Sequence, residues 1–246
     1  MATLTNLPLA HVNFMPGNMA GYQLSADEVH VWCTSISEGV EMLPVYRAPL
    51  NADELARAGK YFQLKDQHRF VISRGMQRMV LGRYMDTAPD KLKFVLGENK
   101  KPKIANNSNK VLFYNLSHAG DRILLAVANS SVGVDVEYLD PDFEFKDILP
   151  ENFSVEEAAY INETNSIERF YKLWTRKEGF LKTIGQGLGD HLSVTPALDG
   201  VHKLPQHLLK SNEDWLQQSF NIAPDHIAAV AYAGNRQLKA YQFNLI

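Results

Sequence analysis

Residues 170–188 read FYKLWTRKEGFLKTIGQGL and predict a helix that ends in a glycine-rich tail. Trp174, Glu178 and Lys182 recur at every fourth position, which places the three side chains on one face of that helix. A glutamate four residues before a lysine is also the favoured order for a helical ion pair, worth about 0.2–0.5 kcal/mol. The stretch alone therefore fits an ordinary exposed helix, and other residues must decide whether it carries a function.

The composition indicates a soluble globular protein of one large or two small domains. The chain has 246 residues with 45% hydrophobic and 22% charged side chains, which is an ordinary balance. No run approaches the roughly 20 apolar residues that span a bilayer, and the N-terminal residues lack a signal-peptide pattern. The single cysteine, Cys33, excludes an intrachain disulfide and a cysteine-cluster metal site. We therefore expect a cytoplasmic protein with no membrane partner, and the net charge of -3 gives no sign of nucleic-acid binding.

The patterns along the chain predict an α+β fold with two similar halves, each running from strand through helices to strands. We expect the first twenty-five residues to form an irregular arm. The predicted strands and helices then follow in this order: strand 28–36, helices 51–62 and 67–85, strands 91–97, 111–120, 122–129 and 132–139, helices 154–163 and 167–184, and tail strands 214–223, 226–233 and 238–246.

The segment GVDVEY carries two acidic residues at strand spacing. Asp135 and Glu137 lie two residues apart, so a strand would direct both carboxylates to one face. Two such carboxylates repel each other unless a cation lies between them, and their oxygens suit Mg²⁺ or Mn²⁺. The alternative is a solvated strand face.

Ser117 and His118, in NLSHAG, end a predicted strand before a turn. Adjacent strand residues point to opposite faces, which argues against a catalytic serine–histidine dyad. The pair could instead donate to an anion or simply make the turn. Further anion-binding candidates are basic residues whose alternative reading is ordinary solvated charge: Arg57, Arg69, Arg74, Lys100, Lys101 and Lys103. The GQGLG tail follows a helix, so it is not a dinucleotide-binding loop.

Taken in order, these pieces resemble the 4′-phosphopantetheinyl transferases. The basic helix, the KP loop, NLSH-G, the GxDxE motif and the WxxKExxxK motif all occur between residues 57 and 188. The length and the NLSH element resemble the larger, pseudo-dimeric Sfp-type more than the short trimeric holo-acyl-carrier-protein synthases. This resemblance implies two α/β halves related by a pseudo-two-fold axis, each a small, mostly antiparallel sheet packed with helices. It divides the chain into a nucleotide-binding half, 1–118, and a metal-binding and catalytic half, 119–246, with the active site at their junction.

The resemblance also implies the reaction. The phosphopantetheine arm of coenzyme A passes to a serine of an acyl or peptidyl carrier protein, with Mg²⁺ (or Mn²⁺) as cofactor and release of 3′,5′-adenosine bisphosphate. The carriers of fatty-acid, polyketide and nonribosomal-peptide synthesis all present such a serine. The attacking oxygen comes from the carrier, which is consistent with the lack of a nucleophile motif in this chain. The larger type is usually a monomer.

Site residues carry over by position. By this resemblance, Asp135, Glu137 and Glu178 would be the metal ligands, Glu178 would also be the candidate general base, and Lys182 would face the pyrophosphate. Trp174 is expected to pack the helix and to fix where Glu178 points. The implied coenzyme A-binding residues are Arg57, Arg69, Lys101, Ser117, His118, Asp135 and Lys182, with Arg74 and Lys177 as secondary candidates. Two positions depart from the family: Lys100 replaces the glycine of its GKP element, and Glu54 replaces a lysine found in some relatives.

Two other functions remain open from the sequence. One is a degenerate member that binds coenzyme A or a carrier without transferring anything. The other is a metal-dependent nucleotide hydrolase that uses the same carboxylates with water as nucleophile. Only a hydrolase would consume coenzyme A when no carrier protein is present.

Overall fold

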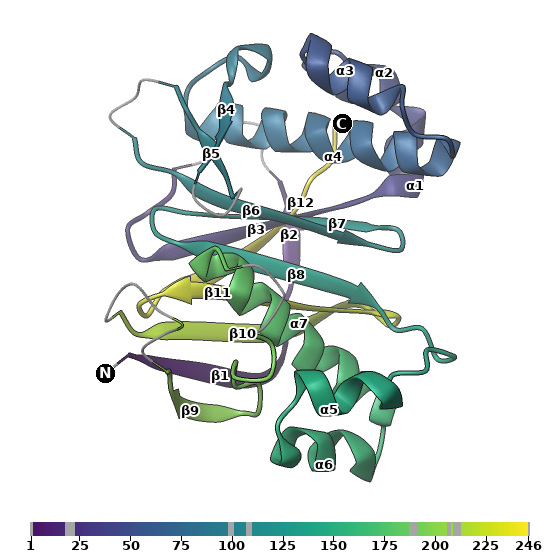
Figure 1. The fold of residues 1–246 in the computed structure, drawn as a ribbon. Helices are drawn as coiled ribbons and strands as arrows, with labels where there is room; N and C mark the ends of the chain where they lie inside the picture. Colours follow the sequence, from purple (N-terminus) through teal and green to yellow (C-terminus); the bar gives the residue numbers. More distant parts are fainter. Residues whose placement is uncertain are drawn as a thin grey trace.

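Two five-stranded sheets stack face to face, and a long helix covers the outer side of each (Figure 1). The computed structural model describes residues 2–17, 23–97, 101–106, 110–186, 191–205, 208 and 213–245. The β3 sheet has the order β2 (Phe14–Pro16), β12 (Gln237–Gln242), β3 (Glu28–Ser35), β7 (Arg122–Ala128) and β6 (Phe113–Ala119). The β8 sheet has the order β8 (Val132–Tyr138), β11 (His226–Ala233), β10 (Trp215–Ala223), β1 (Thr3–His11) and β9 (Gly200–Lys203). A separate hairpin joins β4 (Phe94–Leu96) to β5 (Pro102–Ile104).

The helices lie outside the sheets. They are α1 (Ile36–Glu41), α2 (Leu43–Arg47), α3 (Ala52–Ala58), α4 (Leu64–Tyr84), α5 (Leu149–Asn152), α6 (Val155–Glu163) and α7 (Ser166–Ile184), with short 3₁₀ turns at Pro89–Lys91 and Lys146–Ile148. Helix α4 covers the β3 sheet and α7 crosses the β8 sheet (Figure 1). Among the described residues, no helix combines the length and the apolar character that crossing a bilayer requires.

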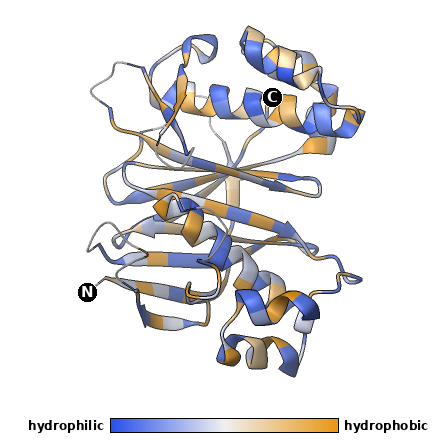
Figure 2. Cartoon of the chain, in the orientation of Figure 1, coloured by the Kyte–Doolittle hydropathy of each residue, from blue (hydrophilic) through white to orange (hydrophobic). Residues whose placement is uncertain are grey.

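One core lies between the two sheets, where apolar side chains of both inner faces pack together. Val31 and Leu124 contribute from the β3 sheet, and Val134 and Val230 contribute from the β8 sheet. Figure 2 colours many residues of these strands as hydrophobic, with hydrophilic residues between them. All eight residues of β3 are buried, because α4 covers the outer face of this strand. The strand predicted at 28–36 is therefore confirmed, and it is buried on both faces.

The expectation of an irregular N-terminal arm is wrong. Residues Thr3–His11 form β1, which pairs in parallel with β10 and antiparallel with β9. The register shifts between Leu7 and Ala10, next to Pro8, which has no N–H to donate to the ladder. The partner strands lie more than 190 residues further along the chain, so no local pattern reveals this pairing.

Each end of the chain joins the sheet that is built mainly from the other half. Strand β1 lies in the β8 sheet, and β12 lies between β2 and β3 in the other sheet. Strand β1 pairs in parallel with β10, and β12 pairs in parallel with β2 and β3. The pairs β1–β9, β3–β7, β6–β7, β8–β11 and β10–β11 are antiparallel. The α+β class with two similar halves is confirmed. The division at residue 118 stays a prediction, while the sheets themselves change over between β7 and β8.

The ends of two helices follow local sequence signals. Asn51 caps α3 by accepting from the N–H of Glu54, whose carboxylate accepts from the N–H of Asn51. This reciprocal capping satisfies two backbone N–H groups that have no partner within the first turn of the helix. Helix α7 ends at Gly185, whose φ of 70° lies in the left-handed region that glycine tolerates.

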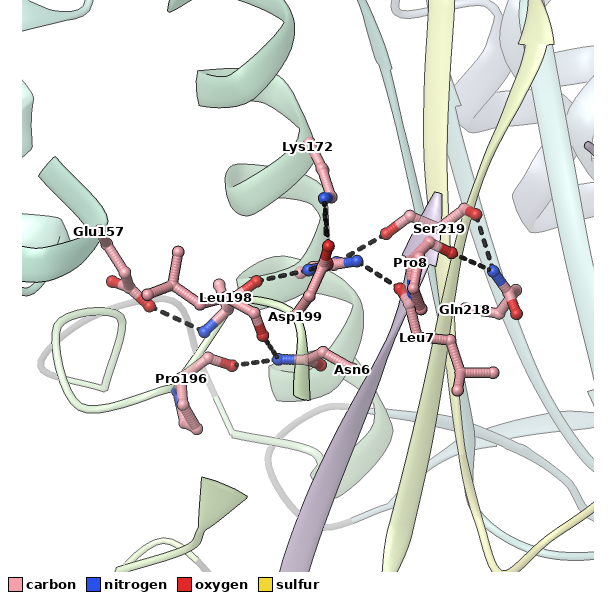
Figure 3. A network of polar contacts seen from close by, with 12 residues as sticks. Asn6, Leu7, Pro8, Glu157, Lys172, Pro196, Leu198, Asp199, Gln218 and Ser219 are labelled. Atoms are coloured by element: carbon pink, nitrogen blue, oxygen red, sulfur yellow. Dashed lines mark hydrogen bonds and ion pairs between the residues drawn. The ribbon is translucent and has the colours of Figure 1, made fainter. Parts of the chain in front are cut away.

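A buried polar network holds the back of α7 (Figure 3). Arg176 donates to Ser219 Oγ at 2.7 Å and to the carbonyls of Ala197 and Leu7, and it also pairs with Asp199. Helix α7 is thereby tied at once to β10, to β1 and to the loop before β9.

Candidate active site

The candidate site lies where β6 and β8, the edge strands of the two sheets, run side by side. Side chains of β6 bridge the two strands. The side-chain oxygen of Asn115 accepts from the backbone N–H of Val134 at 2.9 Å, and Ser117 Oγ donates to Asp135 Oδ1 at 2.9 Å. The NLSH and GVDVEY segments, read separately from the sequence, are therefore one structural unit.

Gly133 allows α7 to pass directly over β8. A Cβ atom at this position would lie 2.3 Å from the carbonyl oxygen of Gly179 and 2.4 Å from the backbone nitrogen of Thr183. These distances are far below van der Waals contact, so only glycine permits the observed packing. The close approach brings Glu178 of α7 next to the carboxylates of β8.

Three carboxylates meet at this point. Asp135, Glu137 and Glu178 each offer an oxygen, and these oxygens lie within 4.8 Å of one another. Asp135 is 2% exposed, and its Oδ2 accepts no hydrogen bond from any described residue. A buried carboxylate oxygen without a partner is costly, and three carboxylates this close together offer the kind of oxygen donor set that Mg²⁺ and Mn²⁺ prefer. The residues present therefore fit a divalent cation.

Burial and mutual repulsion raise the pKa values of two of these carboxylates. Burial, followed by the charges of Asp135 and Glu178, raises the pKa of Glu137 to about 8. Burial and the charge of Asp135 likewise raise the pKa of Glu178. A divalent cation would remove this repulsion and favour the ionised forms.

Lys182 lies among the acidic residues. Its ammonium donates to Asp135 Oδ1 at 2.5 Å and to Ser117 Oγ at 3.3 Å, and it pairs with Glu178 at 3.2 Å. Burial acts to lower the pKa of Lys182, but the charges of Asp135 and Glu178 outweigh burial and raise it. Lys182 is therefore a protonated cation at the centre of the site.

Trp174 does more than pack the helix. Its ring stacks on Phe170 at a centroid distance of 5.7 Å, and its indole N–H acts to lower the pKa of Glu137 and of Glu178, against the larger effect of burial. The sequence predicted that this ring packs the helix and fixes where Glu178 points.

A basic pocket lies beside the carboxylates, between α3, α4 and β6. Arg57, Arg69, Arg74 and His118 all line this hollow of about 230 Å³. The guanidinium groups of Arg57 and Arg74 lie 5.2 Å and 5.7 Å from the ring centre of Phe70. Burial and the charge of Arg69 lower the pKa of His118. The pocket thus gathers the positive charge that an anion needs.

Known proteins resemble this chain over most of its length. A family model described as "4'-phosphopantetheinyl transferase, N-terminal" matches residues 41–130, and one described as "4'-phosphopantetheinyl transferase superfamily" matches residues 131–231. The 4'-phosphopantetheinyl transferase HetI of Nostoc is 30% identical over 218 residues, covering 86% of this chain and 90% of its own. The chain belongs to the 4′-phosphopantetheinyl transferase superfamily. It is an enzyme of that family.

Two further relatives are more distant. A 4'-phosphopantetheinyl transferase of Bacillus subtilis is 28% identical over 62% of this chain and 69% of its own. The L-aminoadipate-semialdehyde dehydrogenase-phosphopantetheinyl transferase of Rattus norvegicus is 25% identical over 74% of this chain and 66% of its own. The two family models meet between residues 130 and 131, where the chain passes from the β3 sheet to the β8 sheet.

In this phosphopantetheinyl transferase, Lys177 does not lie at the site. It is fully buried, pairs with Glu157 at 2.8 Å and donates to the carbonyls of Leu192 and Thr195 at 2.8 Å and 2.6 Å. The secondary assignment of Lys177 to coenzyme A binding is therefore corrected. A residue next to Glu178 on a helix points about 100° away from it, into the interior.

Lys101 also departs from the expected role. Its ammonium donates to the carbonyl oxygens of Val132, Lys182 and Thr183, which uses all three of its donors. In this structure it therefore has no donor left for a phosphate of coenzyme A. Glu54 is equally occupied, since it caps α3 and accepts from Arg78 Nε at 2.7 Å. Lys100 lies outside the described residues.

Proposed function

We propose that this transferase moves the 4′-phosphopantetheine arm of coenzyme A to a serine of an acyl or peptidyl carrier protein, with Mg²⁺ dependence and release of 3′,5′-adenosine bisphosphate. The observation that carries the proposal is the cluster of Asp135, Glu137 and Glu178 with Lys182 among them, beside a basic pocket. Phosphoryl transfer of this kind depends on positioning and on stabilising charge.

The residues divide the work. Asp135, Glu137 and Glu178 would hold a divalent cation, which supplies charge neutralisation at the pyrophosphate of coenzyme A. Glu178 accepts the proton of the carrier serine while the serine oxygen forms its bond to the phosphorus next to the pantetheine. The bond from that phosphorus to the bridging oxygen breaks, and the leaving phosphate keeps the electron pair. Lys182 stabilises that leaving phosphate.

The basic pocket would hold the nucleotide end of coenzyme A. Arg57, Arg69 and His118, with Arg74 beside them, face one hollow of the first half, and the carboxylates lie at the junction with the second half. A single chain supplies both parts, which is consistent with a monomer, and we propose that this monomer acts in the cytoplasm. The carrier could serve fatty-acid, polyketide or nonribosomal-peptide synthesis.

The decisive experiment is the intact mass of an apo carrier protein after incubation with the enzyme, coenzyme A and Mg²⁺. We expect a gain of one phosphopantetheine arm, and no gain when EDTA is added. Asp135→Asn keeps the size of the side chain but removes its charge, so we expect transfer to slow by about 100-fold or more.

Two outcomes would indicate another function, and a third would contradict the role of Asp135. Consumption of coenzyme A without any carrier would indicate a hydrolase. Binding of coenzyme A with no mass gain on fatty-acid, polyketide or peptide carriers would indicate a degenerate binder. Near-normal transfer by Asp135→Asn would remove this residue from the metal site.

A further inference from the structure

The side chain of Lys101 joins the two halves at the end of the catalytic helix. Lys101 directly precedes β5, and its carbonyl accepts from the N–H of Gly97 to close the β4–β5 hairpin. The side chain then leaves the hairpin and reaches into the second half. Its ammonium lies 2.7 Å from the carbonyl oxygen of Lys182 and 3.0 Å from that of Thr183.

These carbonyls are the ones that a helix end leaves without partners. At the end of α7, the carbonyl of Leu181 accepts from the N–H groups of Gly185 and Gln186. The next two carbonyls, of Lys182 and Thr183, receive the ammonium instead. A cation at this end of a helix also interacts favourably with the helix dipole.

The third hydrogen bond of Lys101 reaches β8. Its ammonium lies 3.0 Å from the carbonyl oxygen of Val132, the first residue of that strand. One side chain therefore fixes the end of α7 to the start of the strand that carries Asp135. No described carboxylate pairs with this ammonium, and burial followed by the charge of Lys103 lowers its pKa to about 8. Burying a cation without a counter-ion is costly. The position of Lys101 therefore calls for a role that offsets this cost.

The contacts of Lys182 indicate this role. Its backbone carbonyl is held by Lys101, while its own ammonium reaches Asp135 and Glu178. We propose that Lys101 is a positioning residue: it sets the last turn of α7 against β8 and so places Lys182 between Asp135 and Glu178. This inference deepens the proposed function and rests on it, and it replaces the role of phosphate ligand for Lys101.

The test compares Lys101→Met with Lys103→Met. Methionine keeps the length of the buried stem and removes the ammonium, while Lys103 is an exposed lysine two residues away on β5. In the free protein, we expect Lys101→Met to speed hydrogen exchange of the amides at 181–186 by about tenfold or more. We expect Lys103→Met to leave this exchange unchanged.

Kinetics separate positioning from phosphate binding. A displaced Lys182 should lower the kcat of Lys101→Met by about 10- to 100-fold, because misplacement of a reacting group by about 1 Å is that costly. The Kd for coenzyme A should change by less than about threefold. A large rise in that Kd with kcat and exchange unchanged would overturn the proposal and restore the role of phosphate ligand.

If Lys101→Met does not fold, Lys101→Arg carries the same test, because it keeps a cation and changes its hydrogen-bond geometry. A lower kcat with unchanged Kd for coenzyme A would support positioning, and the reverse would overturn it. Hydrogen exchange is measured on the free protein. The exchange result is therefore independent of activity. If Lys101→Met exchanges faster but the wild-type protein transfers nothing, only the proposed function is contradicted.

Discussion

At the scale of single residues, the site depends on how closely α7 approaches β8. Gly133 makes this approach possible, since even one methyl group would meet the backbone of Gly179 and Thr183. Backbone atoms cannot swing aside as a flexible side chain can. The helix that carries Glu178 and Lys182 would have to move to accommodate any larger residue.

We expect Gly133→Ala to lower the free energy of unfolding by about 1–3 kcal/mol through overpacking, and to reduce transfer by about 100-fold through displacement of α7. Urea unfolding and the carrier-mass assay measure the two effects. Gly59→Ala is the matched control, because its Cβ would lie 3.7 Å from the nearest atoms. Wild-type activity of Gly133→Ala would show that α7 tolerates the shift.

His30 is a second residue with a testable consequence. It is 2% exposed, with Nδ1 2.6 Å from the Tyr84 hydroxyl and Nε2 3.0 Å from Glu28. Burial lowers the pKa of His30 below its ordinary 6.5. The unfolded chain then binds the proton more readily than the folded one, so the contribution of His30 to stability is present above pH 6.5 and is lost as the pH falls below it.

We therefore expect the free energy of unfolding to fall more steeply between pH 6.5 and pH 5 in the wild type than in His30→Gln. Urea unfolding at several pH values measures the difference between the two slopes. Glu28, whose pKa is lowered to about 2 chiefly by its hydrogen bond to Lys239, loses its contribution only below pH 4.5. Parallel slopes for the two proteins would contradict the assignment to His30.

At the scale of elements, α7 is held by different contacts on each side. Its front carries the candidate catalytic groups, and its back carries Arg176 and Lys177 into the interior (Figure 3 shows the neighbouring contacts). Lys177 pairs with Glu157 of α6, whose other oxygen accepts from the N–H of Ala197. The loop before β9 and α6 are therefore both anchored to the catalytic helix.

We expect Lys177→Met to lower the free energy of unfolding by about 3–5 kcal/mol, because it leaves the carboxylate of Glu157 buried without its cation. Lys91→Met is the control: Lys91 pairs with Asp90 at the surface, where an ion pair is worth about 1 kcal/mol or less. Urea unfolding compares the two variants. An equal and small loss in both would mean that the buried pair contributes little.

At the scale of the whole molecule, the exchanged terminal strands link the two halves. The C-terminal segment packs in the core of the first half, where Phe243 is 1% exposed and lies 6.3 Å from Trp32 between ring centres. The N-terminal strand β1 lies in the sheet of the second half, beside β10 and Trp215. Neither half is complete without residues from the far end of the chain.

We expect the halves to unfold together. Phe243→Ala should cost about 3–5 kcal/mol through the cavity it leaves in the first half. The transition should remain single when followed by fluorescence from either of two probes, a variant keeping only Trp32 or one keeping only Trp215. Separate midpoints for the two probes would show that the halves unfold independently.

By itself, the sequence determined the features that arise from local spacing. The period of a strand put Asp135 and Glu137 on one face, the period of a helix aligned Trp174 with Glu178 and Lys182, and Asn51 marked the start of a helix. The order of the motifs was enough to indicate the family. Periodicity and capping act over a few residues, so they can be read without the fold.

Only the tertiary structure decided where the distant partners lie. The segment expected to be an irregular arm is strand β1, which pairs with a strand more than 200 residues away. The ammonium of Lys101 contacts the carbonyl of Lys182, 81 residues further along the chain. The tertiary structure also sent Lys177 inward while its neighbour Glu178 faced the site. Such contacts follow from how sheets and helices pack together, and no pattern of neighbouring residues encodes which distant group a side chain will meet.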